Sequence, residues 1–237
     1  MNAEKPAGTI FVLPPRELAR YIDHTLLKPD ATTKDIERLC AEAREHQFCA
    51  VCVNGSRVEL ARLLLETTGV KVVTVVGFPL GAMDADAKRY EAEAAIDAGA
   101  QEIDLVLNIG RLKDGDDKCV LRELRDVVEA ADERTVKVIL ETCLLTREEK
   151  IRACQLVLDS GAQFVKTSTG FNTGGATIAD VRLLRQVVGP AFGVKAAGGI
   201  REPRTALALI EAGATRLGTS CGVALLAETK PGLAGSD

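Results

Sequence analysis

The chain has 237 residues, of which 46% are hydrophobic, 3% aromatic and 27% charged, and its formal net charge is −4. Scarce aromatic rings argue against a protein that stacks on single-stranded nucleic acid, and interspersed charges of both signs argue against a basic nucleic-acid footprint. The sequence has no apolar run long enough to span a bilayer. We therefore expect neither a nucleic-acid partner nor a membrane partner.

The predicted elements alternate between apolar, β-rich runs and charged, helical runs. A short extra helix is predicted in PPRELAR. The predicted strands that follow it are 20–24, 49–54, 70–76, 102–108, 135–141, 163–168, 192–197 and 215–218. The predicted helices are 32–46, 56–66, 84–97, 117–131, 146–159, 177–187, 203–211 and 221–228. Eight strand–helix pairs predict a parallel sheet covered by helices.

A weak internal repeat favours a closed barrel. The segments DAGAQEIDL, DSGAQFVKT and EAGATRLGT place Gly99, Gly161 and Gly213 just past a predicted helix, where a left-handed residue is needed. No linker divides the chain. We therefore predict an α/β protein made of one (β/α)8 TIM barrel over residues 1–237, with an open doubly wound sheet as the alternative.

Two segments outside the repeating pattern, and the cysteines, bear on the location of the protein. Residues 1–16 are expected to be a soluble lead-in rather than a signal peptide, and residues 229–237 a flexible tail. The seven cysteines are an odd number scattered through apolar segments. Reduced thiols in a cytoplasmic enzyme fit this usage best.

Many polar side chains fall on the inner faces of the predicted strands. Side chains alternate along a strand, so apolar residues such as Ile103 and Leu105 should face the helices while Asp104 points inward. Charged groups are seldom buried unless they are paired or have a task. Together, near the ends of several strands, they indicate an active site at the top of a barrel. The inward polar residues are Asp23, Thr25, Cys52, Asn54, Glu102, Asp104, Asn108, Lys137, Glu141, Lys166 and Ser168.

Two lysines give the sharpest chemical signal. Lys166 lies inside the strand QFVKTST, and Lys195 lies inside GVKAAGG on the neighbouring strand. A lysine must be neutral to attack a carbonyl group, although its unperturbed pKa is about 10.4. Burial and a nearby cation both favour the neutral form. Lys195 can therefore lower the pKa of Lys166, and Asp104 can hold the charge of Lys195 or move protons through a water.

Three turns rich in glycine and hydroxyl groups follow the last three predicted strands. They are STGFNTGGAT at 168–177, AGGIRE at 197–202 and GTSCG at 218–222. The turns after the last strands of such barrels commonly hold phosphate, because backbone N–H groups and helix dipoles suit an anion there. Ordinary loop glycines are the alternative for any one turn. Arg201 can contribute a positive charge, and solvation at the surface explains it equally well.

These motifs resemble a known family. FVKTSTGF, VKAAGGIR, EIDLVLNIG, IDHTLLKP, VCVN and VVGFPLG are together similar to the deoxyribose-phosphate aldolases, over about residues 17 to 228. The resemblance implies a (β/α)8 barrel that cleaves 2-deoxy-D-ribose 5-phosphate into D-glyceraldehyde 3-phosphate and acetaldehyde in deoxyribose catabolism. It implies no metal and no organic cofactor. We expect a homodimer or homotetramer whose partner is a small phosphorylated sugar.

The resemblance also implies roles for individual residues. Lys166 matches the lysine that forms the Schiff base, and Lys195 with Asp104 matches the pair that serves proton transfer. This sequence departs from some members at Phe171, at Cys221 and in a C-terminal tail without tyrosine. Those departures bear on phosphate affinity and proton transfer. The residues expected to bind substrate or its phosphate are Gly170, Gly198, Gly199, Ser220, Thr169, Asp23, Cys52 and Asn54.

Other readings of the sequence carry less weight. Cys49 and Cys52 have CxxC spacing near His46, but within a strand they face opposite ways, which favours core thiols over a zinc or redox site. A metal-dependent aldolase would want more histidines than His24 and His46. Two alternatives stay open: another Schiff-base lyase or transferase on the same barrel, and a non-catalytic sensor of sugar phosphates.

Overall fold

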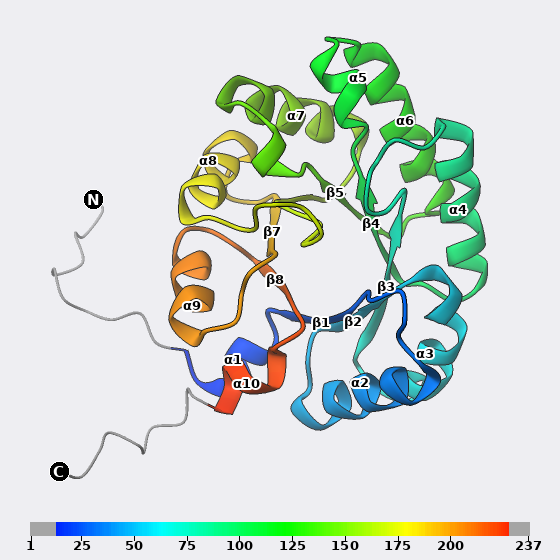
Figure 1. Ribbon diagram of the computed structural model, residues 1–237, viewed down its shortest axis with the longest axis vertical. Coiled ribbons are helices and arrows are strands. Elements are labelled where there is room, and N and C mark those ends of the chain that lie inside the picture. Colours follow the sequence, from blue (N-terminus) through cyan, green and yellow to red (C-terminus); the bar gives the residue numbers. More distant parts are fainter. Residues whose placement is uncertain (1–12, 228–237) are drawn as a thin grey trace, which may run out of the picture.

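The computed structural model describes residues 13–227 and shows eight parallel strands closed into one barrel (Figure 1). Strand β8 pairs with β1, where Asp23 lies opposite Gly218, so the open sheet is excluded. The predicted TIM barrel is confirmed. The strands are β1 Ile22–Leu26, β2 Ala50–Val53, β3 Lys71–Val76, β4 Glu102–Val106, β5 Thr135–Ile139, β6 Phe164–Lys166, β7 Gly193–Ala197 and β8 Arg216–Thr219.

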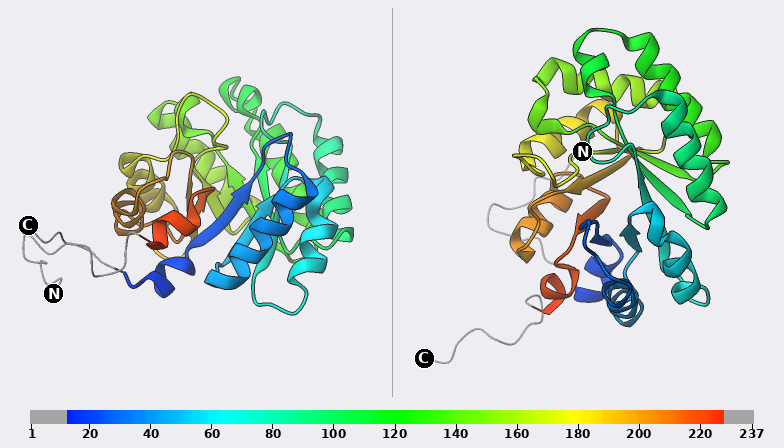
Figure 2. Two further views of the ribbon diagram at one scale, coloured as in Figure 1. Left: turned by 60° about the horizontal axis from the view of Figure 1, so that its bottom comes forward. Right: turned by 45° about the vertical axis from the view of Figure 1, so that its right-hand side comes forward.

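The helices surround the barrel as an outer ring (Figures 1 and 2). The predicted helices and the short helix before the first strand are all present within a few residues. Helix α5 and two short 3-10 helices were not predicted, because they lie in loops. The helices are α1 Pro15–Ala19, α2 Thr33–His46, α3 Val58–Leu65, α4 Ala85–Asp97, α5 Ile109–Lys113, α6 Asp117–Ala130, α7 Arg147–Ser160, α8 Ile178–Val188, α9 Pro203–Glu211 and α10 Gly222–Ala227, with η1 Gly55–Arg57 and η2 Thr142–Leu144.

Local sequence signals explain where several helices begin and end. The side chains of Thr32 and Thr146 each accept a hydrogen bond from the N–H of the third residue of the helix that follows. The carboxylate of that third residue accepts a hydrogen bond from the threonine N–H, which makes two capping boxes. The three repeat glycines all have positive φ, +102° at Gly99, +88° at Gly161 and +114° at Gly213. Their predicted left-handed conformation is confirmed.

The two faces of the strands differ as the alternation predicted. Ile103, Leu105, Val136 and Val138 are fully buried in the core between the strands and the helices. Asn108 is the exception, because β4 ends at Val106 and the Asn108 side chain accepts a hydrogen bond from the Arg111 N–H to cap α5. The predicted inward position of Asn108 is therefore wrong.

The interior of the barrel has an apolar half and a charged half. The apolar half is formed by strands β2 and β3 and the loop after β1, and Phe78 packs against it. The charged side chains come mainly from the other strands. This division leaves an apolar wall beside the polar chemistry. The buried members of the apolar half are Leu27, Ala50, Cys52, Val73 and Val75.

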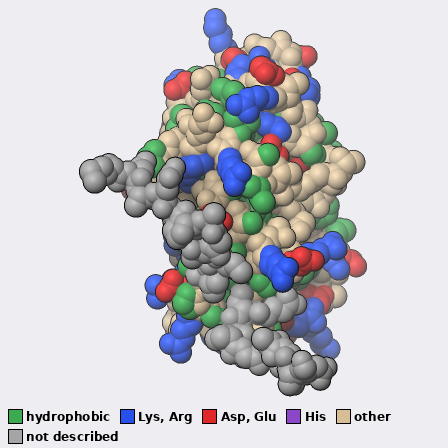
Figure 3. Space-filling model, turned by 90° about the vertical axis from the view of Figure 1, so that its left-hand side faces the viewer, with side chains coloured by type: hydrophobic (Ala, Val, Ile, Leu, Met, Phe, Trp, Pro, Cys, Tyr) green, Lys and Arg blue, Asp and Glu red, His purple; other side chains and the backbone are tan. Residues whose placement is uncertain are grey.

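The surface carries charges of both signs. Figure 3 shows basic side chains interspersed with acidic and uncharged groups on one side of the molecule. Within residues 13–227, no helix has the length and hydropathy needed to cross a bilayer. The expected tail at 229–237 and most of the expected lead-in at 1–16 lie outside the described residues.

Candidate active site

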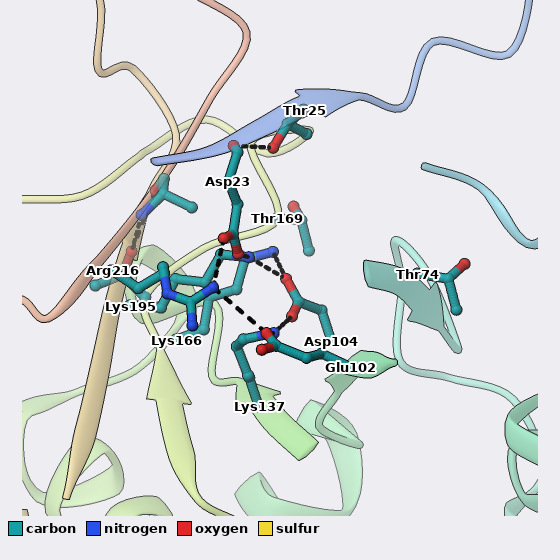
Figure 4. Close-up of polar contacts among 12 residues, drawn as sticks. Asp23, Thr25, Thr74, Glu102, Asp104, Lys137, Lys166, Thr169, Lys195 and Arg216 are labelled. Atoms are coloured by element: carbon teal, nitrogen blue, oxygen red, sulfur yellow. Dashed lines mark hydrogen bonds and ion pairs between the residues drawn. The ribbon is translucent and has the colours of Figure 1, made fainter. Parts of the chain in front are cut away.

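Asp104 in β4 is the centre of a buried network of charges (Figure 4). One of its carboxylate oxygens lies 2.7 Å from the Lys166 amine and 2.7 Å from the Lys195 amine. The other lies 2.9 Å from the Lys137 amine. Lys166 and Lys195 are register partners on adjacent strands, which brings their amines to the same carboxylate. The structure therefore places together the three residues predicted to be catalytic.

A second layer of charges lies toward the N-terminal ends of the strands. Asp23 contacts the Lys195 amine and lies 2.7 Å from the Arg216 guanidinium. Glu102 lies 2.7 Å from the Lys137 amine and 3.4 Å from Arg216. We call Asp23, Glu102, Asp104, Lys137, Lys166, Lys195 and Arg216 the charge cluster.

The two basic residues of this second layer differ in how far they could be predicted from the sequence. Lys137 was predicted to point inward but was not singled out as a site residue. Arg216 was not predicted as a site residue at all. It begins the short strand β8, where its inward direction could have been inferred from alternation. The ring of Phe164 lies 5.8 Å from Arg216 and 6.0 Å from Lys137, within reach of a cation–π contact with each.

The charge cluster favours a neutral Lys166. Burial lowers the pKa of Lys166, and the nearby Lys195 cation lowers it further, while Asp104 opposes both. The net shift is downward. The cluster holds three carboxylates against four basic groups, and the half-exposed Lys71 also pairs with Glu102, so positive charge is in excess. A buried site disfavours uncompensated charge, and Lys166 is the basic group of this cluster whose pKa is lowered.

The neighbours of Lys166 stay charged. Burial alone would lower the pKa of Lys195, but the carboxylates of Asp104 and Asp23 outweigh burial and raise it. Burial alone would raise the pKa of Asp104, but Lys137, Lys166 and Lys195 hold it well below its usual value. In the resting protein Lys195 is therefore a fixed cation beside Lys166. Asp104 is a carboxylate that can accept a proton once one of its cations is lost.

A cavity of about 220 Å³ opens above Lys166. Its walls include the predicted phosphate-binding residues Gly170, Gly198, Gly199 and Ser220 together with Thr169. The structure thus brings these five residues into one cavity with the predicted nucleophile. The other lining residues are Thr25, Leu26, Leu27, Lys28, Phe171, Ala197, Ile200, Arg201, Gly218 and Thr219.

The turns after β6 and β7 pack directly against each other beside this cavity. The Ala176 N–H donates to the Gly198 carbonyl oxygen over 3.1 Å. A Cβ atom on Gly175 would lie 2.3 Å from that oxygen, so only glycine fits there. Gly198 has a φ of +89°, which also favours glycine. The glycines are therefore needed to bring two loop backbones to the cavity wall.

Glu141 holds one of these turns in place. Its carboxylate accepts hydrogen bonds from the Thr169 hydroxyl over 2.5 Å and from the Thr169 N–H over 3.3 Å. Glu141 is buried and has a left-handed backbone, with a φ of +56°. The N–H groups of Leu140 and Thr142, on either side of it, still donate to the carbonyl oxygens of Lys166 and Thr167, so this conformation redirects the Glu141 side chain without breaking the backbone pairing. The sequence predicted that Glu141 points inward but not its contact with Thr169.

The remaining predicted binding residues take other positions. Asp23 lies in the charge cluster below the cavity. Cys52 lies in the apolar half, and burial raises the pKa of its thiol to about 11. Asn54 does not line the cavity; its amide donates to the Leu27 carbonyl oxygen over 3.3 Å. It therefore supports the loop after β1, which does line the cavity.

The residues weighed for a metal or redox site are dispersed. Cys49 is half-buried and Cys52 is buried, and burial raises the pKa of both thiols. In the described part of the chain, no three His, Cys, Asp or Glu side chains are grouped to hold a metal ion. His24 is buried and lies 2.7 Å from Glu42, apart from the charge cluster. This position fits the predicted structural role of His24.

Comparison with known proteins connects this site to a family. Residues 18–228 match the model of the DeoC/LacD family aldolases. A deoxyribose-phosphate aldolase of Alkaliphilus oremlandii is 57% identical over 219 residues, covering 92% of this chain and 99% of the relative. One from Streptococcus pneumoniae is 60% identical over 210 residues, covering 89% and 96%.

A solved structure agrees with the sequence matches. The deoxyribose-phosphate aldolase of Aeropyrum pernix, described as having a unique tetrameric structure, superposes with a TM-score of 0.86. It is 36% identical and covers 92% of each chain. The family model covers well over half of the chain, and the closed eight-stranded barrel agrees with the solved relative. The chain therefore belongs to the DeoC/LacD family of aldolases.

Proposed function

We propose that this protein is a deoxyribose-phosphate aldolase, a carbon–carbon lyase that reversibly cleaves 2-deoxy-D-ribose 5-phosphate into D-glyceraldehyde 3-phosphate and acetaldehyde. The observation that carries the proposal is a buried lysine of lowered pKa, Lys166, at the floor of a cavity walled by glycine turns. High identity to relatives that bear this name supports it.

The geometry supports a Schiff-base mechanism. The neutral Lys166 amine attacks C1 of the open-chain sugar, and the carbinolamine loses water to form an iminium ion. The C3 hydroxyl then loses its proton, the C2–C3 bond breaks, and its electron pair forms an enamine. Protonation of the enamine at C2 and hydrolysis release acetaldehyde and restore Lys166. Each proton transfer needs a group that can both accept and donate near neutral pH.

Asp104 and Lys195 are placed to support these steps. When the iminium ion becomes the neutral enamine, Asp104 loses one cationic partner and is free to relay a proton through a water. Lys195 keeps a positive charge beside the reacting nitrogen, which favours the neutral amine before attack. Asp104 would thus carry protons, while Lys195 would mainly supply charge.

The direct test is a coupled assay of deoxyribose 5-phosphate cleavage combined with reductive trapping. Incubation with acetaldehyde and borohydride should leave a two-carbon adduct on Lys166, identified by peptide mass spectrometry. A sugar-phosphate sensor would show neither turnover nor adduct. Cleavage of a different sugar phosphate in preference to deoxyribose 5-phosphate would instead point to another Schiff-base lyase.

Chelation should leave activity unchanged. In the proposed mechanism the amine of Lys166, rather than a metal ion, activates the carbonyl group. The rate of cleavage is therefore expected to be the same before and after dialysis against EDTA. Loss of activity on chelation, with recovery on adding a divalent ion, would refute the Schiff-base assignment.

Gly199 offers a test of phosphate binding. Its φ is +78°, and a Cβ atom there would meet no atom within 4 Å, so a small residue fits without a clash. Asp and Asn both tolerate a left-handed backbone. Gly199→Asp is expected to raise the KM for deoxyribose 5-phosphate about tenfold or more, because like charges are brought together.

Gly199→Asn is the matched control, since it has the same shape without the charge. It should affect KM much less than Gly199→Asp, and neither variant should change the KM for unphosphorylated deoxyribose by a comparable factor. Equal losses with both substrates would mean that Gly199 serves the fold alone.

The quaternary structure and cellular location are also proposals. We propose a cytoplasmic homodimer or homotetramer, supported by the tetrameric structure of the Aeropyrum pernix relative. Light scattering of the purified full chain would measure the mass of the assembly, and a mass near 25.2 kDa would contradict this proposal.

A further inference from the structure

The cavity above Lys166 is lined by positive charge alone. Besides the amine of Lys166, which the charge cluster keeps neutral, its ionisable lining residues are Lys28 and Arg201, and no carboxylate is among them. This composition is notable in a chain whose acidic residues outnumber its basic ones, with a formal net charge of −4. The cavity is therefore suited to an anionic ligand by its own side chains as well as by its glycine turns.

Lys28 and Arg201 also differ from Lys166 in their partners. Lys166 is paired with Asp104 at the floor of the cavity. Across residues 13–227, the Lys28 amine and the Arg201 guanidinium have no ion pair and no hydrogen bond to another residue. Both side chains are exposed. Their positive charges are thus available to a ligand without breaking an existing contact.

Neighbouring residues fix the loop that carries Lys28. The Asn54 amide donates to the Leu27 carbonyl oxygen over 3.3 Å, and the Arg57 guanidinium donates to the Ala31 carbonyl oxygen over 2.8 Å. Lys28 also precedes Pro29, which restricts its backbone to extended conformations. The loop is therefore tied to the segment after β2 on both sides of Lys28, which gives Asn54 a positioning role.

The order of strands places Lys28 beside the phosphate-binding turns. Arg201 follows β7, Ser220 follows β8, and Lys28 follows β1, which pairs with β8. The turn that carries Ser220 consequently lies between two loops that each bear a cation. A phosphate held by the N–H groups of that turn would have a positive side chain on either side.

We infer that Lys28 is a specificity-determining residue, which binds the phosphate group of the substrate together with Arg201 and the glycine turns. The inference rests on the proposed function for the identity of the sugar, but the binding of phosphate itself can be tested separately. Lys28 would act in substrate binding and in attracting the anion to the cavity, not in the chemical steps at Lys166.

Lys28→Gln is the informative change, because it keeps the length of the side chain and removes its charge. A hydrogen bond to a charged group at an exposed site should change the KM for deoxyribose 5-phosphate about tenfold. The kcat should stay within about twofold, because Lys28 binds the phosphate group and takes no part in the chemical steps at the Lys166 amine. The KM for unphosphorylated deoxyribose should be unchanged, and Lys28→Arg should keep most of the affinity.

The control is Lys34→Gln, which removes an exposed lysine of α2 that does not line the cavity. It should leave both KM values as in the unaltered protein. If Lys28→Gln behaves like Lys34→Gln, or weakens both substrates equally, Lys28 is not a phosphate ligand.

Calorimetric titration with inorganic phosphate separates this inference from the proposed function. The unaltered protein should bind phosphate more tightly than Lys28→Gln, whether or not deoxyribose 5-phosphate is cleaved. Equal phosphate affinity in the two proteins would overturn the inference even if the aldolase assay succeeds. Absence of cleavage with a retained difference in phosphate affinity would overturn only the proposed function.

Discussion

Lys166→Ala is expected to lower kcat/KM for deoxyribose 5-phosphate cleavage by about four orders of magnitude or more, as is usual when a covalent nucleophile is removed. No other amine of the charge cluster faces the cavity, because Lys137 and Lys195 do not line it. The variant should still fold, since Asp104 keeps its contacts with Lys137 and Lys195.

Lys71→Met is the matched control for Lys166→Ala. The Lys71 amine contacts Glu102 at the opposite end of the barrel and is half exposed. Its loss should leave cleavage nearly intact. Circular dichroism and thermal unfolding would show that both variants are folded, and borohydride trapping should label Lys71→Met but not Lys166→Ala. If Lys166→Ala retains even a tenth of the activity, Lys166 is not the nucleophile.

Lys195→Leu is expected to reduce activity at pH 7 by about a thousandfold, in the middle of the range for groups that assist proton transfer. Burial and the Lys195 cation both lower the pKa of Lys166. Removing the cation raises that pKa, so less of Lys166 is neutral at pH 7. Part of the activity should return at higher pH, where Lys166 loses its proton.

The pH profile of kcat/KM measures this effect, because it reports the pKa values of the free enzyme. Its acidic limb should move to higher pH in Lys195→Leu. Asp104 raises the pKa of Lys166, so Asp104→Asn should move the limb the other way and show no alkaline recovery. The double variant should be little worse than the worse single one. Independent, multiplicative losses with an unmoved limb would refute cooperation around Lys166.

Much of this site could be predicted from the alternation of side chains along strands. The phase of β4, β6 and β7 places Asp104, Lys166 and Lys195 inside the barrel, and the barrel fold brings those strands together. The predicted turns could likewise be assigned to one end of the barrel, because the carboxyl ends of parallel strands lie at the same end.

Other features could not be predicted because they depend on contacts between distant parts of the chain. Asp23 and Arg216 meet only because β8 closes onto β1, and alternation says nothing about which charges pair. Glu141 takes a left-handed backbone that its residue type does not favour, which only the packing around Thr169 explains. Asn54 was predicted to touch substrate, whereas its amide supports a loop.

The charge cluster also divides the chain into two complementary halves. Its three carboxylates come from β1 and β4, and its four basic groups come from β5 to β8. In a barrel half containing only β1 to β4, Lys71 can still pair with Glu102, but the basic partners of Asp23 and Asp104 lie on β5 to β8. Those two acids would have to stay hydrated, because burying them without partners is costly. Each half therefore supplies the counterions of the other, and the interior can exclude water only after the last strand has joined the first. The charges that prepare Lys166 for chemistry thus also make assembly of the two halves interdependent.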